Sequence, residues 1–297
     1  MFRREFWAEK DRTKCAQRRV DPPKNAENRQ KTDDIVEEKE VFVTIKAKNV
    51  LAVVLTAILT VLCCVGLNFE AVADVYNGKS VRKLPVYGVD CGEEKKVALT
   101  FDAAWGADKT QSILDTLEEN GATGTFFLVG FWVDKYPDMV KAIANSGCEI
   151  GNHSKNHLHM SELSREEIVT ELKYVSDKVE ELTGSRPAYF RPPFGDYDDL
   201  LVQTVEDEGM QAVQWSVDSL DWKGLSAEEI LSRVKKRVKN GSIILFHNNS
   251  DAIAEALPLV LAYLKNQGYE TVGLSELILK EDYEIDNNGI QHAEPRR

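Results

Sequence analysis

The chain has 297 residues, of which 43% are hydrophobic and 29% are charged, and its formal net charge is -12. This composition is typical of a globular protein and excludes collagen-like and low-complexity chains. The body after residue 48 is strongly acidic and has no basic-aromatic strip, which argues against nucleic acid as a ligand.

Residues 1–45 are polar and mixed in charge, and we expect a cytoplasmic tail there. An apolar segment follows, and its residues 50–67 are 18 consecutive positions without a charge. This length fits a membrane span, and we predict a transmembrane helix over residues 46–69. Lys46 and Lys48, directly before the uncharged stretch, favour a cytoplasmic N-terminus.

The alternative for this apolar segment is a secretory signal, because "AVAD" at residues 71–74 offers an Ala-x-Ala cleavage site. The apolar core of a signal usually has about 7–15 residues, so the greater length favours a retained anchor. We therefore expect a single-pass cell-membrane protein with an extracytoplasmic domain. Residues 70–92 are interpreted as a linker, and residues 281–297 as a flexible C-terminal tail.

Between residues 93 and 280, short β-rich segments alternate with amphipathic segments whose apolar residues are three and four apart. This alternation predicts a parallel α/β architecture. We expect a distorted (β/α) barrel of about seven parallel strands, with an open doubly wound sheet as the alternative. The predicted strands are residues 97–101, 123–130, 148–153, 188–194, 211–217, 242–247 and 269–274.

Three predicted helices begin with N-cap signals. Ser164 and Ser226 are each followed by a glutamate three residues later, which is the capping-box pattern. Asp108 is expected to cap the helix after the first strand.

The five cysteines do not indicate a disulfide framework. Only Cys91 and Cys148 lie beyond the predicted span, and Cys148 falls in a predicted buried strand. A free core thiol is therefore preferred over a disulfide.

Polar residues follow the predicted strands at the carboxyl ends, where a parallel barrel builds its active site. Each of them alone also fits a structural role, such as a turn acid, a surface histidine or an arginine that braces a turn. Together they suggest one site. These residues are Asp102, His153, His157, His159, Arg191, Asp218, Asp221 and His247.

The types and spacing of these residues fit the hydrolysis of an unactivated amide. His153 and His157 stand four residues apart, a separation that presents two imidazoles to one metal ion. Asp102 fits the base that takes a proton from water, and Arg191 would hold it ionised. His247, made cationic by a carboxylate at position 218 or 221, fits the acid that protonates the leaving amine.

Residues 93–280 resemble the polysaccharide deacetylases, carbohydrate esterase family four, which share the NodB-homology domain. Five motifs match in order: "TFDAAWG", "HSKNH", "RPPFG", "DSLDW" and "LFH". The resemblance implies a hydrolase of linear amide bonds that removes N-acetyl groups from cell-wall amino sugars, in peptidoglycan or a chitin-like glycan. It also implies a divalent metal cofactor, with zinc as the expected ion.

The resemblance assigns a role to each matched residue of the site. It implies that Asp102 is the base and that Arg191 holds this base in position. His153 and His157 are implied as metal ligands. His247 is implied as the acid, with Asp221 or Asp218 as its partner.

The sequence departs from the family pattern at Ala103, where family members usually carry a second Asp as the third protein ligand of the metal. Alanine cannot bind a metal, so water, Asp102, or a displaced group such as Asp108 or His159 would have to complete the shell. The form with a single Asp resembles a membrane-anchored, often sporulation-associated subgroup from Gram-positive bacteria. The alternatives to a deacetylase are a non-catalytic glycan-binding protein and an O-acetyl esterase or small-amide deacetylase on the same fold.

Overall fold

The structure is a computed structural model that describes residues 50, 53–61 and 82–294. Residues 53–61 are helical, whereas the predicted tail and most of the predicted span lie outside the described residues. Within the ranges that are described, no helix combines the length and the apolar character that crossing a membrane requires.

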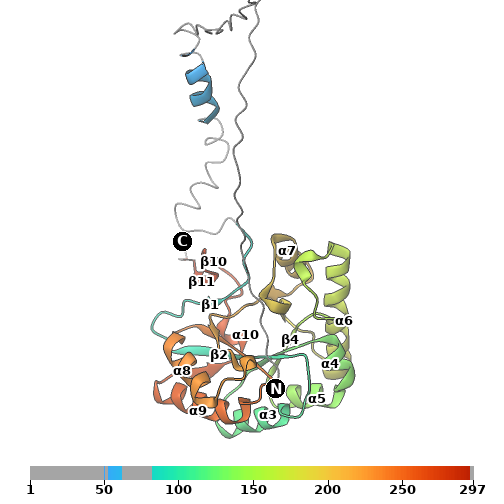
Figure 1. The fold of residues 1–297 in the computed structure, drawn as a ribbon. Helices are drawn as coiled ribbons and strands as arrows, with labels where there is room; N and C mark the ends of the chain where they lie inside the picture. The colour runs from blue at the N-terminus through green and yellow to red at the C-terminus, as the bar shows by residue number, and fades with distance from the viewer. Residues whose placement is uncertain (1–49, 51–52, 62–81, 295–297) are drawn as a thin grey trace, which may run out of the picture. The chain divides into compact units, whose positions relative to one another are not determined.

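A curled sheet of mostly parallel strands forms the centre of residues 82–294 (Figure 1). Its strands are β1 (Gly88–Val89), β2 (Lys96–Ala103), β3 (Thr125–Leu128), β4 (Glu149–Asn152), β5 (Tyr189–Phe190), β6 (Gln211–Ala212), β7 (Val217–Asp218), β8 (Ser242–His247), β9 (Glu270–Val272), β10 (Tyr283–Ile285) and β11 (Ile290–Ala293). They follow one another in the order β10-β11-β1-β8-β2-β3-β4-β5-β6, with β7 paired to β8 and β9 to β2. The expected parallel α/β architecture is therefore confirmed.

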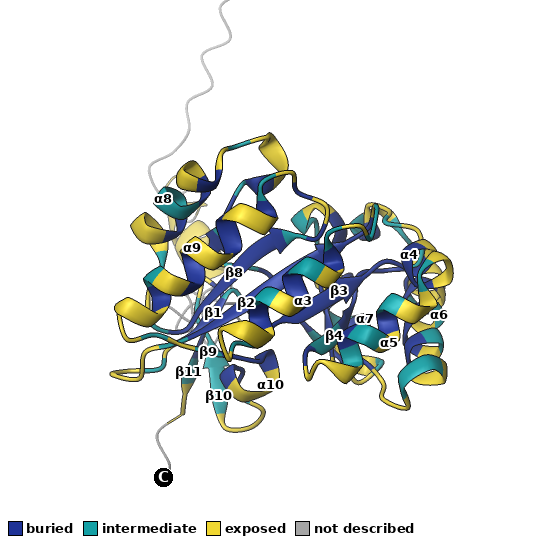
Figure 2. Ribbon diagram, turned by 90° about the horizontal axis from the view of Figure 1, so that it is seen from below, coloured by how far each residue is buried: buried dark blue, intermediate teal, exposed yellow. Residues whose placement is uncertain are grey.

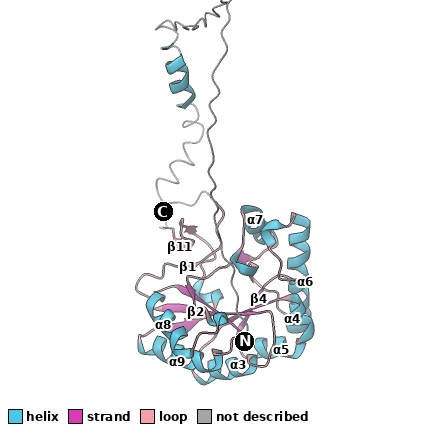
Figure 3. Ribbon diagram, in the orientation of Figure 1, coloured by secondary structure: helices cyan, strands magenta, loops and turns pink. Residues whose placement is uncertain are grey.

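Helices cover the sheet and turn their polar faces to solvent, while the central strands are buried (Figures 2 and 3). They are α3 (Thr110–Glu119), α4 (Gly130–Lys135), α5 (Pro137–Asn145), α6 (Arg165–Thr183), α7 (Asp199–Asp207), α8 (Ala227–Arg237), α9 (Ile253–Asn266) and α10 (Leu274–Leu277). Capping boxes at Ser164 and Ser226 start α6 and α8, as predicted. The predicted cap at Asp108 is wrong, because α3 begins one residue later, after Lys109, without a side-chain cap.

Strand β2 occupies the middle of the sheet, and its successive side chains point alternately to the two faces. Leu99, Phe101 and Ala103 join the larger apolar cluster, where Phe101 stacks on Phe126 with ring centroids 4.8 Å apart. Side chains alternate along a strand, so Asp102 points to the opposite side. The apolar pattern of β2 thus places one carboxylate in the concave interior of the sheet.

The segment before β2 takes part in the fold. Val86 pairs in parallel with Val213, just after β6, and Gly88 pairs with Ser242 at the start of β8. Residues 86–89 therefore connect the β6 edge of the curled sheet back to β8. The interpretation of residues 70–92 as a linker is wrong for this stretch.

The expected flexible tail at residues 281–297 is also corrected for its described part, residues 281–294. Strands β10 and β11 form an antiparallel hairpin, and β11 pairs in parallel with β1. Asn288 and Gly289 lie in the turn, and Gly289 has a φ of 77°, which favours glycine. The two described cysteines, Cys91 and Cys148, are free, as expected.

Candidate active site

A pocket of about 520 Å³ lies at the carboxyl ends of the strands. Most of the residues selected from the sequence converge there, although they come from five different strand ends. Two of them, Arg191 and Asp221, lie buried just behind the wall, with 0% and 1% exposure. The pocket is lined by Asp102, Ala104, Trp105, His153, His157, Phe194, Trp215, Asp218, Trp222, Leu245, His247 and Asn249.

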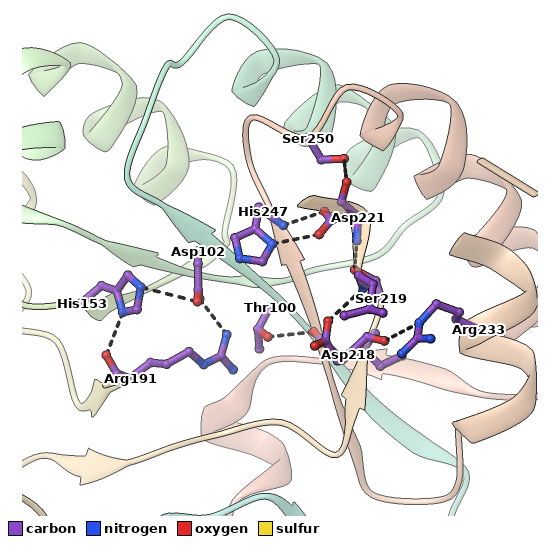
Figure 4. Close-up of polar contacts among 12 residues, drawn as sticks. Thr100, Asp102, His153, Arg191, Asp218, Ser219, Asp221, Arg233, His247 and Ser250 are labelled. Carbon is purple, nitrogen blue, oxygen red and sulfur yellow. Dashed lines mark hydrogen bonds and ion pairs between the residues drawn. The ribbon is translucent and has the colours of Figure 1, made fainter. Parts of the chain in front are cut away.

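Asp102 and Arg191 form a buried ion pair behind the pocket (Figure 4). Arg191 Nη1 donates to Asp102 Oδ1 at 2.8 Å, and its Nη2 donates to the carbonyl oxygen of Gln214 at 3.0 Å. Burial alone would raise the pKa of Asp102, but the charge and hydrogen bond of Arg191, together with the influence of His153 and His247, hold that pKa below the ordinary value. The carboxylate is therefore ionised and able to accept a proton.

His153 presents its lone pair to the same carboxylate. Its Nδ1 lies 2.7 Å from the carbonyl oxygen of Arg191, which can only accept, so Nδ1 carries the proton. The unprotonated Nε2 then lies 3.5 Å from Asp102 Oδ2. Burial lowers the pKa of His153, which keeps the ring neutral. Two electron-rich atoms thus face each other, an arrangement that a cation would stabilise.

His157 lies beside His153, with ring centroids 5.0 Å apart. Burial, and then the proximity of His153, lowers its pKa to about 4, so both rings are neutral at physiological pH. Neutral imidazole is the form that binds a divalent metal. The two histidines therefore fit two positions of a metal shell.

A complete set of protein ligands is not present in the described part of the chain, which contains no group of three or more His, Cys, Asp or Glu residues suited to a metal ion. Ala103 is fully buried in the apolar cluster, while Ala104 lines the pocket. His159 instead stacks on Phe194 and lies 3.3 Å from Asp196, and Asp108 lies in the exposed loop before α3. Neither of the displaced groups considered from the sequence thus completes the shell.

The second proton-transfer candidate is the His247–Asp221 pair. Asp221 accepts from the backbone N–H and from Nδ1 of His247, both at 2.8 Å. Burial would lower the pKa of His247, but the hydrogen bond and charge of Asp221 raise it above the ordinary value. The carboxylate of Asp218 accepts instead from the N–H of Leu220. Of the two acids considered from the sequence, Asp221 is therefore the hydrogen-bonded partner of His247.

Backbone strain is concentrated around this pocket. The structure describes five non-glycine residues with positive φ, and four of them lie in loops at the site, a distribution typical of functional regions. These four are Ser154, His157, Phe194 and Leu220.

Gln214 is a residue that the sequence reading missed. It is 1% exposed, its carbonyl accepts from Arg191, and its Nε2 donates to the carbonyl of Gly195 at 3.0 Å. Its own N–H donates to Val86 at 2.7 Å. The only sequence signal is a polar residue inside the strand segment "QAVQWSV". Gln214 thus links the guanidinium that holds Asp102 to the turn that carries Phe194.

We expect Gln214→Met to lower the kcat/KM of the reaction in this pocket roughly tenfold, because the Gly195 turn loses its anchor and shifts against the pocket. The lost buried hydrogen bond should also cost about 1 kcal/mol of unfolding free energy. Gln203→Met is the matched control, since the Gln203 side chain donates to Asp207 of its own helix α7 and does not line the pocket. A purely structural role would reduce the unfolding free energy and leave kcat/KM unchanged.

Residues 90–213 match the family model "Polysaccharide deacetylase". A peptidoglycan-N-acetylglucosamine deacetylase of Bacillus cereus is 38% identical over 194 residues, which cover 62% of this chain and 89% of that protein. The uncharacterized protein YlxY of Bacillus subtilis is 32% identical over 200 residues, or 67% of this chain and 62% of its own length. The chain thus spans less than two thirds of this second relative.

Solved structures of the same family are also similar. A CE4 family pseudoenzyme from Bacillus anthracis superposes with a TM-score of 0.63 at 34% identity, covering 65% of this chain and 68% of that one. A mutant of that pseudoenzyme, described as having restored enzymatic activity, superposes with the same TM-score at 35% identity, covering 65% and 71%.

Proposed function

This chain belongs to the polysaccharide deacetylase family of amide-bond hydrolases, and from this membership we propose that its pocket removes N-acetyl groups from cell-wall amino sugars, in peptidoglycan or a chitin-like glycan. The observation that carries the proposal is the pairing of an ionised base, Asp102, with a separate acid, His247. The two lie opposite each other on the adjacent parallel strands β2 and β8. A pocket that only bound glycans would need neither group.

In this proposal Asp102 takes a proton from the water that attacks the acetyl carbonyl. Its low pKa keeps it ionised, and Arg191 fixes its orientation through Nη1. His247 then gives a proton to the departing amine. Its Nδ1 is bound to Asp221, so Nε2 is the nitrogen left to face the substrate. An amine leaves an amide only when protonated, so the acid is essential.

A divalent metal ion, with zinc as the expected species, would be held by His153 and His157. Such an ion would supply Lewis-acid polarisation of the acetyl carbonyl. The tautomer of His153 that a metal ion requires is already fixed, because the carbonyl of Arg191 holds the proton on Nδ1 and leaves Nε2 free. With Ala103 in place of a third ligand, the expected affinity for metal is lower than that of a three-ligand site.

We expect acetate release to fall as pH rises through the raised pKa of His247, with a midpoint above about 6.5. Below this midpoint the acid is protonated and active, and above it the proton is lost. Asp221→Asn should shift the midpoint to lower pH and reduce the rate at neutral pH by about 100-fold. Asp218→Asn is the control, and an equal shift in both variants would contradict the role of Asp221.

A second candidate function is a non-catalytic glycan-binding protein. It is favoured by Ala103, which removes a ligand that family members usually carry, and by the similarity to a solved pseudoenzyme. Retention of the acid and base favours the enzyme over this alternative. An O-acetyl esterase would be less dependent on His247, since an alkoxide leaves more readily than an unprotonated amine.

We also propose that residues 46–69 anchor the protein in the cell membrane, with the domain outside the cytoplasm. The uncharged stretch of 18 residues and the lysines before it support this proposal.

The proposed function is tested by incubating purified peptidoglycan with the full chain in detergent. Sugar residues that carry a free amino group are then measured by mass spectrometry. We expect deacetylated glucosamine or muramic acid to accumulate with the wild-type protein and not with His247→Ala. Unchanged peptidoglycan in the presence of zinc or cobalt, with glycan binding retained, would favour the non-catalytic alternative.

A further inference from the structure

A second cavity, of about 780 Å³, lies beside β1, between the C-terminal end of α8 and strand β11. It is larger than the active pocket of about 520 Å³ and has no part in the acid–base chemistry described above. Side chains from four separate segments of the chain form its wall, and most of them are polar. They include Asp90, Trp215, Ser216, Lys236, Arg237 and Lys239.

The cavity gathers positive charge in a domain that is otherwise strongly acidic. Residues 82–294 contain 37 Asp and Glu against 21 Lys and Arg, yet the segment "RVKKRVK" at residues 233–239 has five cations and no acid. Lys236, Arg237 and Lys239 of this segment are exposed and line the cavity. None of the three takes part in an ion pair with another described residue. Their charges are therefore available to a ligand.

The single acid in the wall of this cavity does not neutralise these cations. Asp90 accepts from the backbone N–H of Gly92 at 3.0 Å, and its carboxylate lies 3.1 Å from Nδ1 of His292. Its charge is thus engaged at the β11 side of the cavity. The excess of positive charge on the opposite side favours the binding of an anion.

Part of this charge also has a structural explanation, because cations in the last turn of a helix face the negative end of its dipole. Lys235, Lys236 and Arg237 all lie in the last turn of α8. Lys235 does not line the cavity, and its ammonium group lies over the ring of Tyr263 at 5.1 Å. Lys239 follows the end of the helix and still lines the cavity. The dipole therefore does not account for the gathering of three cations around one cavity.

The cavity adjoins the active pocket. Trp215 contributes to the walls of both. Ser216 lines the cavity and Asp218 lines the pocket, and two residues this close in the chain have Cα atoms no more than about 7 Å apart. A peptide substituent spans about 3.3 Å per residue when extended. A substrate held in the pocket can therefore place such a substituent in the cavity.

We propose that the cavity binds the carboxylate groups of the stem peptide on a peptidoglycan substrate, through Lys236, Arg237 and Lys239. This proposal rests on the proposed action on a cell-wall glycan. It also narrows that action, because a chitin-like glycan is uncharged and carries no peptide. A local positive cavity lets an acidic domain bind an acidic substrate that its net charge would otherwise repel.

The test is calorimetric titration of the full chain, in detergent and with EDTA present. The two ligands are a disaccharide tetrapeptide of peptidoglycan and the same molecule with its peptide carboxylates amidated, so that they differ only in charge. We expect the free-acid ligand to bind at least tenfold more tightly at low salt. This difference should shrink at high salt, because interactions between exposed charges are screened.

Lys236→Gln, Arg237→Gln and Lys239→Gln should each reduce this difference about two- to fivefold, which is the usual effect of an exposed ion pair. The triple variant should bind both ligands equally. Lys235→Gln is the matched control, because it removes the same charge from the same helical turn but outside the cavity. Thermal unfolding of each variant verifies that the domain is folded.

Equal affinity of the wild type for both ligands, a full difference in the triple variant, or an equal loss in Lys235→Gln would overturn the proposal. Titration with short-chain phosphatidylglycerol examines a lipid phosphate as another anion. Binding of this lipid that is lost in the triple variant, without a difference between the two peptide ligands, would assign the cavity to lipid and also overturn the proposal.

Acetate release from both peptide ligands in the presence of zinc separates this result from the proposed function. Release without a preference for the free-acid ligand in binding would leave the deacetylase intact and reject the role of the cavity. Preferential binding of the free-acid ligand without release would support the cavity and reject the deacetylase.

Discussion

Asp102→Asn is expected to lower acetate release by about 100- to 10,000-fold, because the asparagine amide cannot accept the proton from the attacking water. The variant should also be less stable. Arg191 is 0% exposed, and its positive charge would lose the carboxylate that compensates it, although the asparagine oxygen can still accept from Nη1. Leaving one member of a buried ion pair uncompensated costs about 3–5 kcal/mol.

The pH dependence of unfolding separates these two effects of Asp102. Its lowered pKa contributes stability above the unfolded-state value of about 3.9, and this contribution is lost as pH falls through the folded-state pKa. As the pH is lowered from about 4, the wild type should therefore lose more unfolding free energy than Asp102→Asn, as measured by urea unfolding. Asp108→Asn, in the exposed loop before α3, is the matched control. Wild-type acetate release by Asp102→Asn would exclude Asp102 as the base.

Ala103→Asp is expected to increase both metal affinity and the rate of acetate release. In the family pattern this position carries the third protein ligand. Loss of a group that only supports a metal ligand typically changes metal affinity about 10–100-fold, so adding a direct ligand should have at least this effect. Without metal the variant should be destabilised, because the new carboxylate replaces a fully buried alanine in the apolar cluster. Metal should restore its unfolding temperature.

The informative comparison is Ala104→Asp, which places the same charge one residue further along, at a position that lines the pocket. Metal binding is measured by calorimetry and activity by acetate release. A gain confined to Ala103→Asp supports a third ligand position at residue 103. A gain confined to Ala104→Asp would move that position to the residue that lines the pocket, and no gain in either would contradict a metal site on the two histidines.

Much of the fold and the site could be predicted because a buried parallel strand is recognisable from a short apolar segment of the sequence. The apolar segment of β2 leads into Asp102 near its end, and the apolar segment of β8 ends in His247. Their pairing then follows from the architecture, since parallel neighbours bring their carboxyl ends together. The same logic brought His153 to the pocket from the end of β4.

Other features depend on tertiary contacts that no local pattern specifies. The choice of Asp221 over Asp218 depends on the turn at Leu220, whose positive φ is not evident from its residue type. Gln214 acts through its backbone carbonyl as much as through its side chain. The hairpin of β10 and β11 was missed although it carries a signal, the Asn288–Gly289 pair between β-rich segments.

The central claim is that the pocket hydrolyses the N-acetyl groups of a cell-wall glycan. The most direct measurement is acetate released by the full chain from N-acetylglucosamine oligomers, after EDTA and then with zinc, cobalt or no added metal, beside His153→Ala. We predict release that requires metal and is lost in the variant. No release with any metal, while the same oligomers bind, would contradict the claim and identify a glycan-binding protein that has lost catalysis.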